Sequence, residues 1–261
     1  MIPKPSSAAW FETAFRREYL EVYAHRDQAS AAAEVAFLLE QGLDGSVLDL
    51  CCGQGRHLIA MRESGLEAFG LDLSHELLAC AGSLDGGDGI QGFLTRADQR
   101  LLPIQDQTLD GVTLLFSSFG YHDDEGDARV LQELARVLKP NGLLVLDLMN
   151  PARIRSSLVP HSVREEQGLR LEETRSLSED GLRVRKQVRL SRAGNEPLAW
   201  REDVRLYDPG NLDSLLEAHK FGGIHRWGGF GGQVFDEKAP RQLVLARRTA
   251  QVTSSSLYSG I

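Results

Sequence analysis

The stretch VLDLCCGQGRH, residues 47–57, places an acidic side chain and two glycines where they could bind a small charged molecule. Asp49 lies within a short apolar run, and Gly53 and Gly55 follow it closely. Glycine lets the backbone approach a ligand and adopt positive φ. A carboxylate at this point suits a cationic group, such as the ammonium of an amino acid, better than a pyrophosphate. The alternative is a structural acid that accepts hydrogen bonds from the turn.

A second acid, Asp72, ends the next apolar run, 17 residues after Gly55. A carboxylate at this distance from a glycine turn can accept the hydroxyls of a ribose. The dinucleotide pattern G-x-G-x-x-G is incomplete, because Leu58 stands where its third glycine is required. The spacing therefore favours a nucleoside cofactor without a pyrophosphate. Asp72 could instead serve only the N-cap of a helix, together with Ser74.

The elements that must position these residues alternate between helices and strands. Helical periodicity over 29–42 is followed by a strand at 47–50, a helix at 56–65 and a strand ending near Asp72. The same alternation continues to residue 150, with a short strand expected at IQGFLT (90–95) and a turn at KPNG (139–142). Apolar runs such as VTLLF and LLVLDL are typical of strands that are covered on both faces. We predict an α/β fold with parallel strands and helices on both faces of the sheet.

The pattern changes at Pro151. Residues 169–207 alternate apolar and polar side chains and are interrupted by EDG and AGNEP, which predicts an antiparallel meander. The glycine-rich stretch WGGFGGQVF is expected to be a hairpin loop before a final strand, RQLVLARR. The expected organisation is an N-terminal helical lid (1–46), a cofactor-binding α/β core (47–150), an antiparallel β insertion over the active site (151–208), the end of the core (209–249) and a flexible tail (250–261).

Five motifs in order, VLDLCCGQGRH, GLDLS, TRADQRLLP, LDGVTLLFSSFGY and LARVLKPNGLLVLDLMN, resemble those of the class I S-adenosylmethionine-dependent methyltransferases. The meander resembles the insertion that covers the active site in members acting on small molecules, including sugar amines. The segment FRREYLEVYAHRD resembles their lid. The resemblance implies a Rossmann-like, mostly parallel seven-stranded sheet with an antiparallel β insertion. It also implies S-adenosylmethionine as the cofactor and S-adenosylhomocysteine as the product.

The resemblance assigns roles to particular residues. Cys51 stands where the family commonly has a glycine, and Asp98 could also belong to an ordinary polar turn. The implied cofactor site comprises Asp49, Cys51, Gly53 and Gly55 along the methionine part, Asp72 at the ribose, Leu73, Asp98 and Gln99 at the adenine, and Phe116, Ser117 and Ser118 beneath the cofactor.

Methyl transfer from a sulfonium requires no metal and no covalent intermediate. An amine acceptor must arrive neutral, whereas a hydroxyl acceptor benefits from a general base. His122 and His25 are the candidate bases, although His122 could simply face solvent ahead of a helix. Tyr19, Tyr23 and Tyr121 could close the pocket through their hydroxyls. Tyr19 and Tyr23, four residues apart, could instead pack on one helix face.

Composition narrows the possible partners. The net charge of −8 argues against binding to nucleic acid or to an anionic membrane. No apolar stretch is long enough to span a bilayer, and three cysteines without metal-ligand spacing suggest reduced thiols in the cytoplasm. We expect a cytoplasmic methyltransferase with a small-molecule acceptor. The alternatives are a methyltransferase for RNA or protein, and a non-catalytic protein that binds S-adenosylmethionine.

Overall fold

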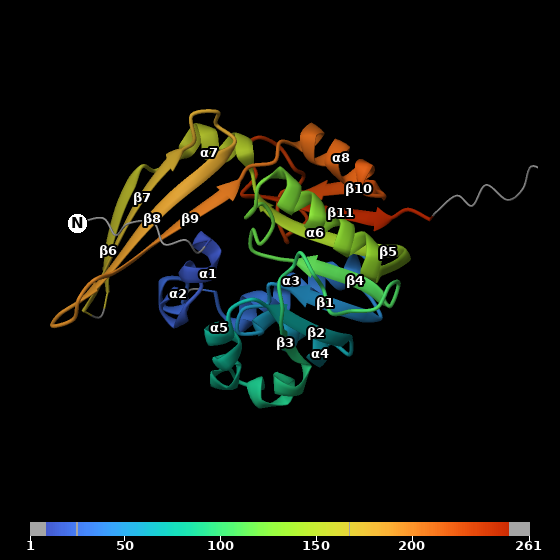
Figure 1. Ribbon diagram of the computed structural model, residues 1–261, viewed down its shortest axis with the longest axis horizontal. Helices are drawn as coiled ribbons and strands as arrows, with labels where there is room; N and C mark the ends of the chain where they lie inside the picture. The colour runs from blue at the N-terminus through green and yellow to red at the C-terminus, as the bar shows by residue number, and fades with distance from the viewer. Residues whose placement is uncertain (1–8, 25, 167, 251–261) are drawn as a thin grey trace, which may run out of the picture.

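The computed structural model describes residues 9–24, 26–166 and 168–250, so His25 and residues 251–261 of the expected tail lie outside the described residues. Within them, a seven-stranded sheet forms the body of the molecule, in the order β10, β11, β5, β4, β1, β2, β3 (Figure 1). Neighbouring strands from β5 to β3 are parallel, and β11 is antiparallel to β5 and β10. These findings confirm the predicted fold class. The strands are β1 (Ser46–Leu50), β2 (Glu67–Asp72), β3 (Leu94–Arg96), β4 (Leu109–Leu114), β5 (Leu138–Met149), β10 (Phe221–Trp227) and β11 (Arg241–Arg248).

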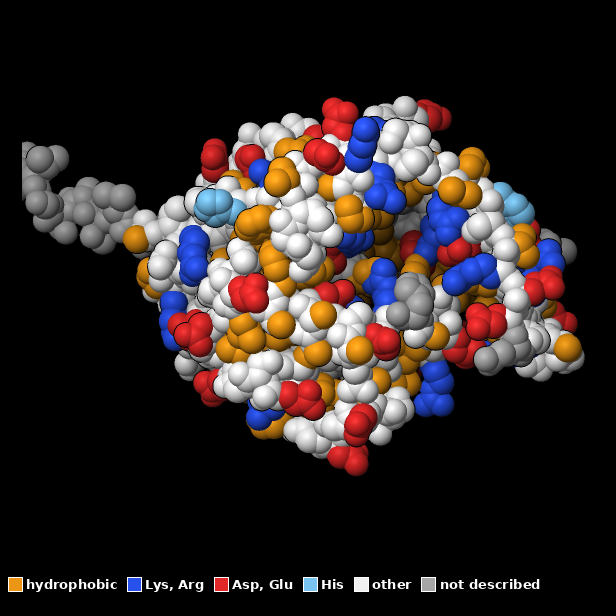
Figure 2. Space-filling view, turned by 180° about the vertical axis from the view of Figure 1, so that it is seen from behind, with side chains coloured by type: hydrophobic (Ala, Val, Ile, Leu, Met, Phe, Trp, Pro, Cys, Tyr) orange, Lys and Arg blue, Asp and Glu red, His pale blue; other side chains and the backbone are white. Residues whose placement is uncertain are grey.

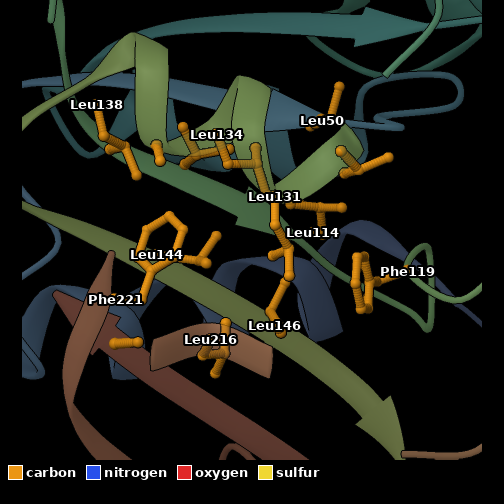
Figure 3. Packing of buried hydrophobic residues seen from close by; sticks show 14 of the residues in the cluster. Leu50, Leu114, Phe119, Leu131, Leu134, Leu138, Leu144, Leu146, Leu216 and Phe221 are labelled. Carbon is orange, nitrogen blue, oxygen red and sulfur yellow. The ribbon is translucent and has the colours of Figure 1, made fainter. Parts of the chain in front are cut away.

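Helices cover both faces of this sheet because its strands are apolar on both faces. On one face lie α6 (Asp124–Val137) and α8 (Pro209–Ala218). Figure 3 shows Leu131 and Leu134 of α6 and Leu216 of α8 packed with Leu144 and Leu146 of β5. On the other face lie α3 (Gln28–Glu40) and α4 (Arg56–Glu63), followed along the chain by α5 (His75–Ala79), η1 (Ala81–Ser83) and η2 (Gly87–Phe93).

The antiparallel sheet after residue 150 stands apart from the body (Figure 1). Its strands pair in the order β6 (His161–Glu166), β7 (Leu169–Leu177), β8 (Arg183–Arg192) and β9 (Leu198–Arg205). We call this sheet the roof. In β8 the inward-facing Val184, Val188 and Leu190 are buried, whereas Arg185 and Arg189, each next to one of them, are exposed, as the alternating sequence predicts.

Two short helices, α1 (Trp10–Ala14) and α2 (Arg17–Val22), lie between the roof and the body (Figure 1). Val22 of α2 packs against the buried face of the roof. The third helix of the region expected to be a lid, α3, packs instead on α4 and the main sheet through Val35 and Leu38. No helix within the described ranges is both long and apolar enough to cross a bilayer.

Several elements differ from the sequence-based expectation. Strand β6 has a polar sequence and lies at the edge of the roof, so its residues gave no apolar signal. Helix α7 (Pro151–Ser157) was not predicted, although Asn150 caps it and proline stands at its first turn. The expected turn KPNG lies inside β5, where the register with β4 shifts and Asn141 has φ +66°. Residues 90–93, expected to be extended, lie in η2.

Candidate functional site

A pocket of about 360 Å³ lies where the carboxyl ends of β1, β2 and β4 face α1 and α2. The surface is hollowed between the body and the roof, and Lys and Arg side chains gather round the hollow (Figure 2). Most of the residues singled out from the sequence line this pocket, and Gly55 and Ser117 do not. The predicted residues in its lining are Tyr19, Asp49, Cys51, Gly53, Asp72, Leu73, Asp98, Gln99, Phe116, Ser118, Tyr121 and His122.

Asp49 is a buried acid whose hydrogen bonding is incomplete. Its register partners are Gly70 of β2 and Thr113 of β4, so it lies in the middle of the sheet. The Thr113 hydroxyl donates to Asp49 Oδ1 at 3.2 Å, while Oδ2 is buried without a partner among the described residues. Burial raises the pKa of the Asp49 carboxyl. Because an unsatisfied buried acceptor is costly, the arrangement suits a ligand that brings a cationic donor.

Arg26, which the sequence analysis did not single out, lines the same pocket. Its guanidinium lies over the ring of Phe116 and 5.2 Å from the centre of the Tyr23 ring. Burial lowers the pKa of Arg26 to about 10, so it remains charged at neutral pH. No carboxylate of the described part of the chain forms an ion pair with it. A basic residue directly before the helix cap Asp27 was the available sequence signal.

Asp72 joins the turn after β1 to the start of α5. Its Oδ2 accepts the Gly53 N–H at 2.8 Å, and its Oδ1 accepts the Ser74 N–H at 2.7 Å. Ser74 in turn caps α5 by accepting the Leu77 N–H. Each carboxylate oxygen has a further lone pair available to a ligand. The capping arrangement and a pocket-facing carboxylate are therefore compatible, although burial raises the pKa of Asp72.

The two glycines of the loop have different roles. Gly53 has φ +59° and lines the pocket, and a Cβ there would meet only Leu77, at 3.8 Å. Gly55 has φ +86° at the N-cap of α4, and a Cβ there would lie 2.5 Å from Ile90 Cδ1. Packing against η2 requires the glycine at position 55, and Gly55 is not among the residues that line the pocket. Its close approach to a ligand stays a prediction. Cys51 has φ +61°, which explains why glycine would suit its position.

Gln99 connects the thiol of Cys51 to His122. The thiol donates to Gln99 Oε1 at 3.7 Å, so the amide nitrogen is the donor to His122 Nε2, 3.1 Å away. His122 is buried rather than solvent-facing, and burial lowers its pKa to about 4. The imidazole is therefore neutral at pH 7, with its Nε2 lone pair already engaged. Asp98, next to Gln99, forms a two-pronged ion pair with Arg100, and this hydrogen bonding lowers the pKa of Asp98.

Aromatic side chains from α1, α2 and the loop after β4 form the outer wall of the pocket. The Tyr19 and Tyr23 rings are 4.5 Å apart, and Phe15 stacks on Tyr121 at 5.6 Å. Tyr19 and Tyr23 therefore pack on each other and also line the pocket. Burial holds the pKa values of Tyr19 and Tyr121 well above their ordinary range, so both hydroxyls stay protonated.

Ser117 is the second predicted residue that the pocket does not include. Its hydroxyl accepts a hydrogen bond from Arg241 Nη2 at 2.8 Å, behind Phe116. Its neighbours Phe116 and Ser118 line the pocket, and the expected position of Ser117 beneath a cofactor stays a prediction.

Residues 47–142 match the model of a family described as a methyltransferase domain. This region belongs to the methyltransferase domain family. The domain has the class I fold, as the comparison with solved structures also shows. The CcbJ methyltransferase from Streptomyces caelestis superposes with a TM-score of 0.77 at 17% identity, over 94% of this chain and 100% of that one. The sugar N-methyltransferase KedS8 from Streptoalloteichus superposes with a TM-score of 0.69 at 20% identity, over 96% and 100%.

The curated relatives match this chain over less than half of their own length. A putative methyltransferase, YqeM of Bacillus subtilis, is 33% identical over 111 residues, which cover 42% of this chain and 44% of that protein. Demethylmenaquinone methyltransferase of Thermotoga maritima is 37% identical over 109 residues, or 40% and 44% of the two chains. The matched segment thus spans less than half of each relative, whereas the structural similarity extends to the roof.

Proposed function

We propose that this protein is an S-adenosylmethionine-dependent methyltransferase whose acceptor is a small molecule with a neutral amine. The observation that carries the proposal is the pairing of two unmatched charges in one pocket. Asp49 offers a buried carboxylate oxygen without a donor, and Arg26 offers a guanidinium without an acid. An amino acid group brings an ammonium and a carboxylate, which complement these two side chains. The methionine end of S-adenosylmethionine is such a group.

The other lining residues fit the nucleoside. Asp72 stands at the end of β2, with lone pairs free for ribose hydroxyls. Leu73, Asp98 and Gln99 follow along the same edge of the pocket and would surround the adenine. An amino pentose methyltransferase of the same fold, CalS10, has been solved with S-adenosylmethionine bound, at a TM-score of 0.63 and 20% identity. When bound, the cofactor supplies an electrophilic methyl group on a sulfonium.

The chain's own residues would contribute positioning and exclusion of water. Direct methyl transfer depends mainly on holding the acceptor atom in line with the methyl group in a dry site. Phe15, Tyr19 and Tyr121 form an apolar wall over the pocket, and their rings also favour a nearby cation. The roof packs on Val22 of α2 and so supports the helix that carries Tyr19. A pocket enclosed in this way favours a compact acceptor over RNA or protein.

The protonation states of the pocket residues favour an amine as the methyl acceptor. His122 is neutral with its Nε2 lone pair engaged by Gln99, and Tyr19 and Tyr121 are held protonated. Within the described pocket lining, these predicted catalytic residues are therefore poor proton acceptors at neutral pH. A hydroxyl acceptor would need such a group, whereas a neutral amine attacks with its own lone pair. The structural neighbour KedS8 is described as a sugar N-methyltransferase, which is consistent with an amine acceptor.

Calorimetric titration with S-adenosylmethionine and S-adenosylhomocysteine tests the cofactor assignment. We expect binding to wild-type protein that Asp72→Ala weakens by about 1 to 3 kcal/mol, because ribose hydroxyls lose an acceptor. Glu67→Ala is the matched control, since Glu67 is exposed at the other end of the same strand. Absence of binding to the wild-type protein would refute the proposal, and binding with no turnover in any acceptor screen would favour the non-catalytic alternative.

The acceptor class is tested by screening pairs of molecules with the same carbon skeleton, one bearing an amine and the other a hydroxyl. Formation of S-adenosylhomocysteine is the readout. Methylation of amines but not of their hydroxyl counterparts is expected, and the reverse preference would contradict the acceptor assignment while leaving the cofactor assignment intact.

A further inference from the structure

Two consecutive residues at the carboxyl end of β4 have left-handed backbone conformations. Phe116 has φ +64° and Ser117 has φ +60°. Neither is glycine, so both conformations are strained and persist only where surrounding contacts impose them. The strained pair brings the Phe116 ring to the pocket, where it lies under the Arg26 guanidinium and 5.5 Å from the Tyr23 ring.

The contacts that impose this conformation come from Asp147 on β5. Its carboxylate Oδ2 accepts the Phe116 N–H at 2.7 Å, and its backbone oxygen accepts the Ser117 N–H at 2.7 Å. The side chain is almost completely buried, and the bonds connect adjacent parallel strands at the end nearest the pocket. Both backbone donors of the strained pair are thus satisfied by one residue.

Arg241, at the start of β11, completes the arrangement from the next strand. Its Nε donates to Asp147 Oδ1 at 2.6 Å, and its Nη2 donates to the Ser117 hydroxyl at 2.8 Å. Arg241 therefore fixes the Asp147 carboxylate and the Ser117 side chain at once. The same guanidinium also donates to the Asp147 backbone oxygen at 3.3 Å. Asp147 and Arg241 touch the back of the strained pair, and neither lines the pocket.

We propose that the Asp147–Arg241 ion pair is a positioning device that holds the Phe116 ring as the support for Arg26. The pair thereby sets the place at which the pocket receives a carboxylate. The identity of that carboxylate, the methionine end of S-adenosylmethionine, rests on the proposed function. Asp147 and Arg241 act through Phe116 and do not contact the cofactor themselves. Phe116 is a specificity element because its ring determines where the guanidinium lies.

The chemistry of Asp147 suggests the decisive variant. Its two carboxylate oxygens accept from two different donors, the Phe116 N–H and the Arg241 Nε–H. An asparagine has the same shape but only one acceptor oxygen, and its amide would place N–H against one of the donors. Asp147→Asn should therefore release either the strained backbone or the arginine without creating a cavity.

Asp110 provides a matched control on the same two strands. It lies near the amino end of β4, accepts the Ser46 N–H at 3.0 Å and pairs with Lys139 of β5 at 2.8 Å. Like Asp147 it binds one backbone donor and one cation, but it is far from the pocket lining. Asp110→Asn removes an ion pair of the same chemistry, in a more exposed place, without touching Phe116. It therefore measures the effect on ligand binding of losing a carboxylate charge between these strands.

The first measurement is hydrogen exchange in the protein without added ligand. Asp147→Asn should accelerate exchange at the Phe116 and Ser117 amides, while Asp110→Asn leaves both protected. The second measurement is calorimetric titration with S-adenosylmethionine, for which Asp147→Asn should raise the Kd about tenfold and Asp110→Asn should change it less than about threefold. A further substitution, Ser117→Gly, should recover part of the affinity of Asp147→Asn, because glycine adopts the left-handed conformation without help.

The possible failures are distinguishable. Wild-type protein that does not bind S-adenosylmethionine would refute the proposed function, while the exchange data would still test the positioning of Phe116. Equal effects of Asp147→Asn and Asp110→Asn on the Kd, or unchanged exchange at Phe116 in Asp147→Asn, would overturn the positioning role. Loss of affinity that Ser117→Gly does not relieve would indicate a purely structural ion pair.

Discussion

Asp49 and Arg26 line the same pocket, and neither forms an ion pair with an opposite charge within the described residues. Asp49 lies on β1, an inner strand of the sheet, and Arg26 lies in the segment between α2 and α3. A folded chain rarely leaves an acid and a base unpaired and partly buried, because each loses hydration without compensation. Their common exposure to one pocket is the reason to expect a zwitterionic ligand group there.

Replacing each loop glycine with alanine should lower the stability of the fold to different extents. Gly55→Ala combines φ +86° with a Cβ 2.5 Å from Ile90, so it should lower the free energy of unfolding by about 2 kcal/mol or more. Gly53→Ala meets no close neighbour and should cost about 1 kcal/mol, from its left-handed backbone alone. Urea unfolding of both variants checks this order. Equal destabilisation of the two variants would mean that the Ile90 side chain moves aside for the added methyl group at little energetic cost.

The pH dependence of stability should reveal a compensation between His122 and Asp127. Burial lowers the pKa of His122 to about 4, so its contribution to stability is lost as pH falls from about 6.5 towards 4. Burial raises the pKa of Asp127 to about 6, so its contribution is present at low pH and is lost as pH rises through 6. The two trends oppose each other between pH 4 and 6. The two residues are also adjacent, since the backbone N–H of His122 donates to the Asp127 carboxylate at 3.3 Å.

Replacing His122 should make the contribution of Asp127 to the pH dependence of stability measurable. In His122→Gln, the free energy of unfolding should fall as pH rises from 4 to 6 more steeply than in the wild type, by of the order of 1 to 3 kcal/mol. Denaturant titrations at several pH values measure the difference. Parallel pH profiles for the two proteins would mean that His122 is protonated in the folded state at pH 5.

The same substitution tests whether His122 removes a proton during catalysis. With an amine acceptor found by the paired screen, His122→Gln should retain kcat within about fivefold, because the imidazole is neutral and engaged by Gln99. A general base contributes typically 10² to 10⁴-fold. A loss of kcat of that size, together with a pH–rate profile that loses its acidic limb, would show that His122 acts as the general base.

The sequence predicted the central sheet because each of its elements carries a local signal. Apolar runs marked β4 and β5, and glycines with an acid marked the turn after β1. The positions of Asp49 and Asp72 at adjacent strand ends followed from parallel order alone. Strand β6 was missed because an edge strand with one exposed face has no apolar run, and its pairing with β7 is what makes it extended.

The remaining site residues depend on contacts between distant segments. Arg26 reaches Phe116, and Arg241 reaches Ser117, across 90 and 124 residues of sequence respectively. No periodicity or motif encodes such pairs. The Arg241 contact arises when β11 pairs with β5 and β5 with β4, and the Arg26 contact arises when the segment between α2 and α3 reaches the end of β4. The packing requirement at Gly55 could not be predicted for the same reason, since the Ile90 side chain that excludes a Cβ comes from η2.

The most direct test of the paired charges compares S-adenosylmethionine with a nucleoside that lacks its amino acid end and, with it, the sulfonium charge. Calorimetry should measure S-adenosylmethionine and 5′-methylthioadenosine, which lacks both the ammonium and the carboxylate, against wild type, Arg26→Met and the exposed control Arg129→Met. We predict that Arg26→Met weakens S-adenosylmethionine binding about tenfold or more, leaves 5′-methylthioadenosine within about twofold, and that Arg129→Met changes neither. Equal weakening of both ligands by Arg26→Met, or no weakening of either, would contradict the account.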